Sequence, residues 1–422
     1  MLTAIVGVNW GDEGKGRMVD MLSESFDVVC RYQGGNNAGH TVVNEKGKFI
    51  LNLLPSGVLR ETTVNVMGPG MVIDLRHLRD EVGRVAAGGV KITPDNLLIS
   101  DKAVICLPFH PVQDVLEEER LGDRRYGSTR RGIAPVYSDK YMKKALRMGD
   151  LFSGNLATRV YDICEWKNLT LTGGYGAQPV DPGDVAAWLT EFGDWAKPFV
   201  ADVSDYLYYA ARDKKNILFE AQLGALRDID YGIYPYTSSS TTLAAYAPIG
   251  AGAPGLKLDS VIGVVKAYSS AVGEGPFTAE MFGPEADRLR EAGAEYGAAT
   301  SRPRRVGPFD AVASRYGAQV QGADALALTK LDVLGYMDRI PIVTAYDIDG
   351  ERTRDFPSGD ALERAVPVVE YVEGFAEDVS KCRSVRDLPV AARNYVSRIE
   401  SECGVPVKYI SVGADRGACV VL

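Results

Sequence analysis

Seven short runs rich in β-branched residues constrain the fold of this chain more than any other feature. They cover residues 3–8, 27–32, 216–220, 260–268, 325–331, 341–346 and 407–412. Helical patterns separate them, and the clearest places Ala392, Tyr395, Val396 and Ile399 on one face before a stop at Gly404. This alternation predicts an α/β fold with a large, mainly parallel central sheet flanked by helices.

The length of the chain bears on how many domains it forms. Its 422 residues, of which 46% are apolar, supply enough material for one large α/β core. The glycine- and proline-containing segment 172–184 is the best candidate for a junction, but strand patterns resume after it. We therefore expect one elaborated domain over residues 1–422, with a helical or loop subdomain around 105–205.

Charge and hydropathy exclude several classes of protein. The chain has 47 basic and 56 acidic residues, and the net charge of −9 argues against a surface that coats nucleic acid. No apolar run reaches the roughly 20 residues needed to cross a bilayer, and the N-terminus lacks a basic leader. The six cysteines form no C-x-x-C pair, which favours buried thiols. We expect a cytoplasmic protein with no nucleic-acid or membrane partner.

The stretch VGVNWGDEGKGR (6–17) follows the first predicted strand and precedes a helix that we expect to begin after Gly16. Such a loop directs backbone N–H groups and a helix dipole at an anion, with Lys15 as a point charge. It departs from the usual phosphate loop, because Asn9 replaces the first glycine and Gly16 stands where a hydroxyl normally binds Mg²⁺. Asp12 is the candidate for the missing oxygen ligand.

A second stretch, RYQGGNNAGHT (31–41), places amides and one histidine among three glycines at the end of a strand. His40 differs from His77, which lies in a charged helical pattern and is interpreted as structural. Gly39 allows a ligand to approach the backbone, and Asp12 could share the site. An acid and a histidine together are a proton-transfer arrangement.

Two further patterns indicate anion and base recognition. The segment AATSRPRRVG (298–307) concentrates three arginines in four positions, which favours a carboxylate or phosphate clamp over a solvated loop. The segment TKLD (329–332) ends a strand, and its lysine and aspartate suit a guanine base. By contrast, GAGAPG (250–255) lacks the strand before it and the helix after it that a dinucleotide site needs, so we interpret it as a turn.

In this order and spacing, these motifs resemble the adenylosuccinate synthetase family nearly end to end. The resemblance includes WGDEGKG, RYQGG-N-NAGHT, LLPSG, STRRGI-PVYSDK, LRMGDLF, DID-G-YPYTSS, KAYSS-VG-GPF, T-R-RR-G, TKLDVL and IS-G-DR. It implies a P-loop-NTPase-like fold and a GTP- and Mg²⁺-dependent ligase that joins L-aspartate to IMP through a 6-phosphoryl intermediate. It also implies a homodimer with a shared active site.

The resemblance assigns expected roles to individual residues. Asp12 would take the IMP N1 proton and bind Mg²⁺ together with the Gly39 carbonyl, while His40 and Lys15 would support the transferring phosphoryl group. The expected GTP contacts are Gly11, Glu13, Gly14, Lys15, Gly16, Arg17, Gly39, Thr41, Arg304, Lys330, Asp332, Ser411 and Gly413. The expected IMP contacts are Asn37, Thr129, Lys143, Gln222, Leu223, Ser238 and Arg302. The expected aspartate contacts are Ala298, Ala299, Thr300, Arg302 and Arg304.

Three departures from the family pattern concern the acceptor. Leu223 stands where the family has a nucleotide-contacting glutamine, and a strand bulge would be needed to bring Gln222 to that place. Lys143 replaces an arginine that reaches across the dimer, and the loop at 298–305 is altered. The alternatives are therefore the same chemistry on another 6-oxopurine nucleotide or amino acid, or a non-catalytic paralogue that binds guanine nucleotides. Retention of both Asp12 and His40 argues against the paralogue.

Overall fold

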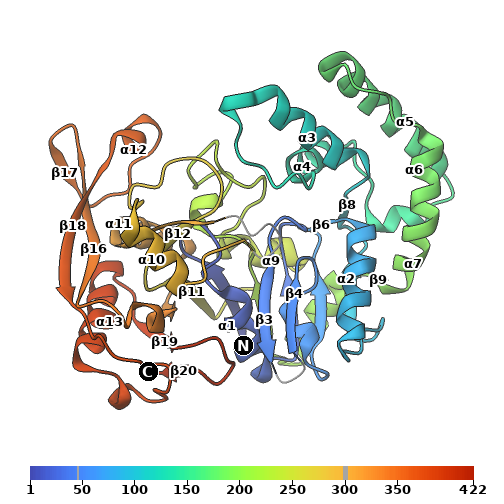
Figure 1. Cartoon of the computed structure of the whole chain (residues 1–422). Coiled ribbons are helices and arrows are strands. Elements are labelled where there is room, and N and C mark those ends of the chain that lie inside the picture. Colours follow the sequence, from blue (N-terminus) through green and yellow to red (C-terminus); the bar gives the residue numbers. More distant parts are fainter. Residues whose placement is uncertain (45–46, 298–302) are drawn as a thin grey trace.

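A computed structural model describes residues 1–44, 47–297 and 303–422. Its centre is a ten-stranded sheet in the order β20-β19-β15-β11-β1-β10-β2-β5-β7-β9 (Figure 1). Every pairing in it is parallel except β19 with β20. The ten strands are β1 (Leu2–Gly7), β2 (Val28–Arg31), β5 (Val64–Met67), β7 (Leu97–Ser100), β9 (Val200–Ala201), β10 (Ile217–Glu220), β11 (Ser260–Lys266), β15 (Ala325–Thr329), β19 (Val407–Ser411) and β20 (Cys419–Val421).

Helices cover both faces of this sheet, as predicted from the alternation of strands and helices. The α-helices within the described ranges are α1 (Lys15–Leu22), α2 (Leu75–Ala87), α3 (Phe109–Leu121), α4 (Ile133–Tyr141), α5 (Leu156–Asn168), α6 (Pro182–Trp188), α7 (Asp194–Ala196), α8 (Val203–Arg212), α9 (Ala247–Ala251), α10 (Pro284–Ala292), α11 (Ala311–Gln321), α12 (Asp360–Arg364) and α13 (Val390–Cys403), and not all of them lie on the central sheet. The C-terminal helix α13 ends at Gly404 with φ 71°, and all four residues of its predicted apolar face are buried. The prediction of an α/β fold is therefore confirmed.

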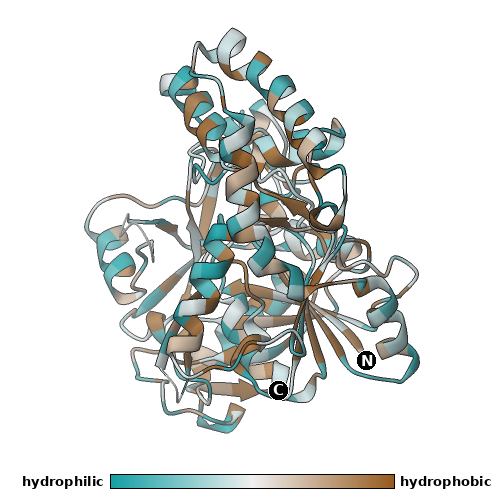
Figure 2. Cartoon of the chain, turned by 90° about the vertical axis from the view of Figure 1, so that its right-hand side faces the viewer, coloured by the Kyte–Doolittle hydropathy of each residue, from teal (hydrophilic) through white to brown (hydrophobic). Residues whose placement is uncertain are grey.

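Strand β1 shows how the two faces are packed. Ala4 and Val6 belong to a core cluster with residues of α8 and α9, whereas Ile5 packs with Met18 and Val19 of α1. Alternate side chains of a strand point to opposite faces, so a strand covered on both sides is apolar throughout. Figure 2 shows that strands and helices differ in this respect: the sheet strands are mostly hydrophobic, while the helices carry hydrophobic and hydrophilic residues.

The remaining strands form smaller sheets at the margins. They are β3 (His40–Asn44), β4 (Gly47–Leu51), β6 (Val72–Ile73), β8 (Val104–Ile105), β12 (Ser269–Ala271), β13 (Arg305–Gly307), β14 (Phe309–Asp310), β16 (Arg339–Ile348), β17 (Glu351–Thr353) and β18 (Val366–Glu373). The run 341–346 is a strand as predicted, but it lies in β16, which pairs antiparallel with β17 and β18 outside the central sheet. One of its faces is more exposed, which antiparallel sheets accommodate.

The segment 105–205 is mainly helical. Helices α5 and α6 lie on the opposite side of the molecule from β16–β18, and α3 and α4 lie at the top of the view (Figure 1). Five of the six cysteines are buried and Cys419 is half-buried, in agreement with the expectation of buried thiols. Along the described ranges, no helix combines the length and the apolar character needed to span a membrane.

Candidate active site

The candidate residues gather along the carboxyl edge of the central sheet. Six neighbouring strands, β19, β15, β11, β1, β10 and β2, run parallel, so the segments that follow them all leave from one edge. In open α/β sheets, ligands bind outside the carboxyl ends of the strands. The phosphate loop follows β1. Lys330 and Asp332, which are expected to bind a guanine base, follow β15, and Gln222 follows β10.

The phosphate loop is closed by Glu13, whose carboxylate turns inward. Its Oε1 accepts from the N–H groups of Asn9 at 3.1 Å and Gly11 at 2.8 Å, and its Oε2 pairs with Lys15 Nζ at 2.6 Å. Glu13 and Lys15 are both buried. Helix α1 begins at Lys15, earlier than predicted, because Gly14 with φ 97° forms its N-cap. The loop is thus held in shape by an internal ion pair.

Asp12 lies at the open side of the loop. It has φ 59°, a left-handed conformation that aspartate tolerates better than most residues. Its Oδ2 lies 3.2 Å from Arg304 Nε, and its side chain retains 31% exposure. The guanidinium of Arg304 also pairs with the buried Glu295 at 2.8 Å. A partly exposed carboxylate and an arginine that already pairs with a buried carboxylate are therefore adjacent.

The acid that contacts His40 is Glu220, which the sequence analysis did not identify. His40 Nδ1 lies 2.8 Å from Glu220 Oε1, and the same carboxylate accepts from Ser56 N–H and Ser56 Oγ, both at 2.7 Å. Burial acts to raise the pKa of Glu220, but the contact with His40 and the charge of Arg31 outweigh it and lower that pKa. A Cβ on Gly16 would lie 2.7 Å from His40 Cβ, so only glycine lets the histidine lie against the start of α1.

The residues expected around a guanine base gather near Arg17. Its guanidinium donates to Ser411 Oγ and to the carbonyls of Asp415 at 2.7 Å and Ala418 at 2.8 Å. Ser411 ends β19 beside the end of β15, after which Lys330 takes φ 62° and Asp332 follows. Burial raises the pKa of Asp332, whereas the nearby charges of Lys330 and Arg17 act to lower it.

Gln222 lies fully buried just after the end of β10. Its Nε2 donates to Asn37 Oδ1 at 3.0 Å, and its Oε1 accepts from Arg31 Nη2 at 2.8 Å. No strand bulge brings Gln222 to the position of Leu223, because β10 pairs one to one with β1 and β2 up to Glu220. Instead Leu223 takes φ 63°, and its Cδ2 lies beside Gly11 of the phosphate loop.

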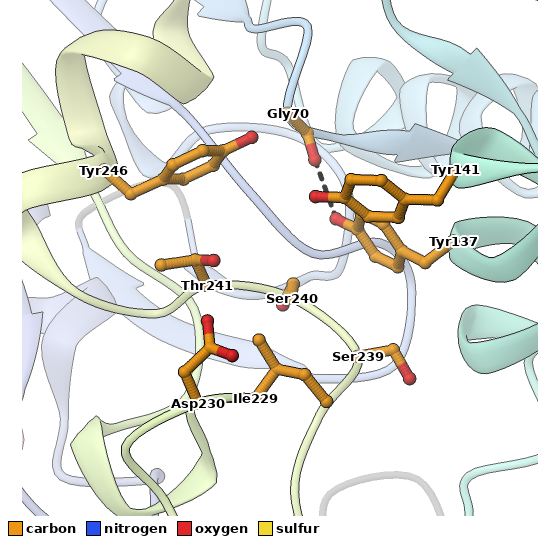
Figure 3. Close-up of a pocket in the computed structure, with 9 residues that line it drawn as sticks. All are labelled: Gly70, Tyr137, Tyr141, Ile229, Asp230, Ser239, Ser240, Thr241 and Tyr246. Carbon is orange, nitrogen blue, oxygen red and sulfur yellow. Dashed lines mark hydrogen bonds between the residues drawn. The ribbon is translucent and has the colours of Figure 1, made fainter.

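A serine turn continues this network. Ser238 Oγ lies 3.1 Å from Ser240 Oγ, which donates to Gln33 Oε1 at 2.9 Å, and Gln33 Nε2 donates to the Gln222 carbonyl at 2.6 Å. Ser240 also lines a cavity of about 210 Å³. Figure 3 shows Tyr137 there, donating to the Gly70 carbonyl at 2.7 Å. The cavity is lined by Gly70, Tyr137, Tyr141, Ile229, Asp230, Ser239, Ser240, Thr241 and Tyr246.

Several expected contact residues are not joined to this network by side-chain bonds. Thr129 is exposed in the loop between α3 and α4, and Lys143 is exposed just after α4 with φ 61°. Thr41 is exposed on β3, while Gly39 and Gly413 are half-buried. The expected contacts Ala298, Ala299, Thr300 and Arg302 lie outside the described residues.

The residues at the edge suit a metal ion that arrives with phosphates. Within the described ranges, no group of three or more His, Cys, Asp or Glu side chains is arranged to hold a metal. Asp12 offers one partly exposed carboxylate, and Glu13 is occupied within the loop. Mg²⁺ commonly takes one or two carboxylates and completes its shell with substrate phosphates and waters. The oxygen donor set of Asp12 and Gly39 fits that chemistry.

Comparison with known proteins gives one consistent result. The family model described as adenylosuccinate synthetase matches residues 4–420. The chain is 45% identical over 420 residues to adenylosuccinate synthetase 2 of Pseudoalteromonas translucida, covering 99% of both chains. It is 43% identical over 423 residues to the adenylosuccinate synthetase of Caldanaerobacter subterraneus, covering 100% of this chain and 99% of that protein.

Solved structures agree with the sequence relatives. The structure of fully ligated adenylosuccinate synthetase from Plasmodium falciparum matches with a TM-score of 0.92 and 34% identity, covering 100% of this chain and 99% of that one. Cyanophage S-2L succinoaminodeoxyadenylate synthetase, bound to dGMP and dATP, matches with a TM-score of 0.61 and 20% identity, which shows a shared fold alone. The family model and the sequence relatives each span nearly the whole chain, and this chain belongs to the adenylosuccinate synthetase family.

Proposed function

We propose that the carboxyl edge of the central sheet is the active site, with GTP phosphates on the loop after β1 and the acceptor nucleotide near Asn37. The reaction is that of the family, in which GTP drives the ligation of L-aspartate to IMP and yields adenylosuccinate, GDP and phosphate. The observation that carries the assignment of roles is the adjacency of Asp12 and Arg304 at 3.2 Å above a loop whose own charges are already paired.

In the first step, Asp12 takes the N1 proton of IMP, and the O6 atom attacks the γ-phosphorus of GTP. The bond from that phosphorus to GDP breaks, and a 6-phosphoryl nucleotide forms. His40 Nδ1–H donates to the Glu220 carboxylate, and in the imidazolium form, with both ring nitrogens protonated, Nε2–H is proposed to donate to a phosphoryl oxygen. Lys15 is proposed to support the same phosphoryl group from the start of α1, where it shares its charge with Glu13. Positioning and charge stabilisation supply most of the catalysis.

In the second step, the amine of aspartate attacks C6 and phosphate leaves with the former O6 oxygen. Arg302 and Arg304 are proposed to hold the carboxylates of aspartate, because guanidinium groups bind carboxylates through two parallel hydrogen bonds. A Mg²⁺ ion held by Asp12 and the Gly39 carbonyl would neutralise charge on the phosphates when it is bound. Lys330 and Asp332 are proposed to bind the guanine base, with Ser411 and Gly413 covering it.

A homodimer with a shared site forms part of the proposal. Lys143 is exposed and lies next to Tyr141 and Met142, which are 76% and 49% exposed. Large apolar side chains exposed beside a charge are a common feature of interfaces. We propose that a second copy of the chain covers this surface and receives Lys143 near its IMP phosphate.

A different acceptor nucleotide is the second candidate, and Leu223 is the observation that favours it. Its side chain lies beside Gly11, and it offers no polar contact to a purine. Gln222 cannot serve in its place without giving up its bonds to Arg31 and Asn37. A site without that polar group discriminates less strongly among purines that differ at one polar position.

Phosphate release measured across a panel of nucleotides and amino acids tests the proposed substrates. We expect release that requires GTP, IMP and L-aspartate together, with ATP a much poorer donor. Activity with other 6-oxopurine nucleotides but none with IMP would refute IMP as the acceptor. Equal use of GTP and ATP would refute the guanine contacts assigned to Lys330 and Asp332.

A further inference from the structure

Behind Arg304 lies a buried ionic cluster that the proposed steps do not use. Its centre is Glu295, which is fully buried, and Lys266 and Tyr268 around it are 4% and 2% exposed. Glu295 Oε1 accepts from Lys266 Nζ at 2.7 Å and from Tyr268 OH at 2.5 Å. Lys266 also donates to Ser270 Oγ at 2.6 Å. Burying charges costs free energy unless they are paired, and here each charge has a partner.

The second oxygen of the same carboxylate belongs to Arg304. Glu295 Oε2 accepts from Arg304 Nη1 at 2.8 Å, and the Glu295 carbonyl accepts from the Arg304 backbone N–H at 2.9 Å. Arg290 Nε donates to the Arg304 carbonyl at 2.9 Å. Arg304 is therefore fixed through its backbone and its side chain, with Nε 3.2 Å from Asp12 Oδ2.

The segment that carries Glu295 also contacts Lys330, which is proposed to bind the guanine base. Lys330 Nζ donates to the carbonyl of Gly293 at 2.6 Å, two residues before Glu295. Burial alone would raise the pKa of Glu295, but the charges of Lys266, Arg304 and Lys330 outweigh it and lower that pKa to about 2. Glu295 thus carries a full negative charge throughout the neutral pH range.

We propose that Glu295 is a positioning residue for the ligase reaction: it holds the Arg304 guanidinium beside Asp12, in the orientation that receives a carboxylate of the amino-acid substrate. The inference rests on the proposed role of Arg304 in binding aspartate. Without Glu295, the long arginine side chain would sample other rotamers, and aspartate binding would have to restrict it.

The two oxygens of Glu295 allow the positioning role to be separated from a merely structural one. In Glu295→Gln, Lys266 and Tyr268 both donate to the amide oxygen, so the amide NH₂ group faces Arg304. Two hydrogen-bond donors then face each other, and the bond to Arg304 is lost. In the control Tyr268→Phe, one hydrogen bond to Oε1 is lost while the contact to Arg304 is untouched. Both variants lower stability, but only the first changes how Arg304 is held.

The experiment measures KM for aspartate, KM for IMP, kcat and the melting temperature of the full-length enzyme for Glu295→Gln, Tyr268→Phe and Arg304→Ala. We expect Glu295→Gln to raise KM for aspartate about tenfold or more, because a charge-assisted hydrogen bond is lost, with KM for IMP little changed. We expect Tyr268→Phe to lower the melting temperature without changing KM for aspartate. If Glu295→Gln does not fold, Glu295→Asp replaces it, since the shorter carboxylate cannot serve both Lys266 and Arg304.

The outcomes distinguish the inference from the proposal on which it rests. If Arg304→Ala raises KM for aspartate and the Glu295 variants do not, the positioning role is overturned while the proposed function stands. An equal rise in KM for aspartate in Tyr268→Phe would also overturn it. That result would mean that losing any hydrogen bond of the cluster weakens aspartate binding by destabilising the region, and not through the contact between Glu295 and Arg304. If Arg304→Ala leaves KM for aspartate unchanged, the role assigned to Arg304 fails and the inference fails with it.

Discussion

The phosphate end of the site and its acceptor end differ in how far a single chain completes them. At the phosphate end, buried groups pair with one another, as Lys15 does with Glu13 at 2.6 Å. At the acceptor end, near Asn37, Gln222 is likewise buried and bonded to Arg31 and Asn37, but Lys143 and Thr129 are exposed, and no side-chain bond joins either of them to this network within the described residues. The phosphate end is organised before a ligand binds, whereas the acceptor end combines a buried network with surface groups that the second copy in the proposed homodimer would cover.

This difference determines which kinetic quantity each end controls. Charges that are buried and held in place interact strongly and need no reorganisation during the reaction. Exposed charges are screened by water and contribute little until a partner excludes it. Substitutions at the phosphate end should therefore reduce turnover, and substitutions at the acceptor end should reduce affinity for the acceptor nucleotide.

The largest effect is expected from Asp12→Asn at the phosphate end. The amide can neither take the N1 proton nor offer a negative charge to Arg304 and Mg²⁺, and we expect turnover to fall by about a thousandfold or more. Asp123→Asn, at an exposed residue of the short 3-10 helix Gly122–Arg124, serves as the control. Phosphate release and circular dichroism measure activity and folding. Turnover within tenfold of the parent enzyme would refute the assigned role of Asp12.

A smaller loss, confined to the acceptor end, is expected from Lys143→Ala. We expect kcat/KM for IMP to fall roughly a hundredfold if this charge contacts the IMP phosphate, and Lys144→Ala to have little effect. Mixing Lys143→Ala subunits with Asp12→Asn subunits should restore activity. Lys143 from the Asp12→Asn chain would complete the site that carries Asp12 in its partner. Confirmed heterodimers without regained activity would contradict the shared site.

Much of the fold was predictable from the sequence, because local patterns carry it. The β-branched runs and the face of α13 follow periodicities that a single chain displays directly. Strands β5, β7, β9 and β20 were not predicted, since their place in the sheet is decided by neighbours in space. The place of β16 outside the central sheet depends on β18, which lies beyond the reach of a local pattern.

The candidate site was predictable only where a motif contains its own partners. Glu13 and Lys15 lie two residues apart in one glycine-rich loop that the sequence analysis singled out, although the ion pair between them was not predicted. Glu220 lies 180 residues from His40, and only the sheet order brings them together. A glutamate that ends a buried strand was the one available signal, because a carboxylate in such a place needs a partner.

Glu220→Gln tests whether this missed residue belongs to the phosphate end in function as well as in position. The ionised carboxylate is the normal state above pH 4.5, since the pKa of Glu220 lies below that ordinary value. The amide removes the charge beside His40 while keeping the shape of the side chain, and we expect kcat to fall about tenfold with KM for IMP little changed.

Ser56→Ala is the matched control, because it removes one hydrogen bond to the Glu220 carboxylate and leaves the negative charge of that carboxylate beside His40. If both variants lose activity equally, packing around the strand end rather than the charge on His40 governs turnover. If Glu220→Gln instead raises KM for IMP alone, His40 acts on the acceptor and belongs to the other end of the site.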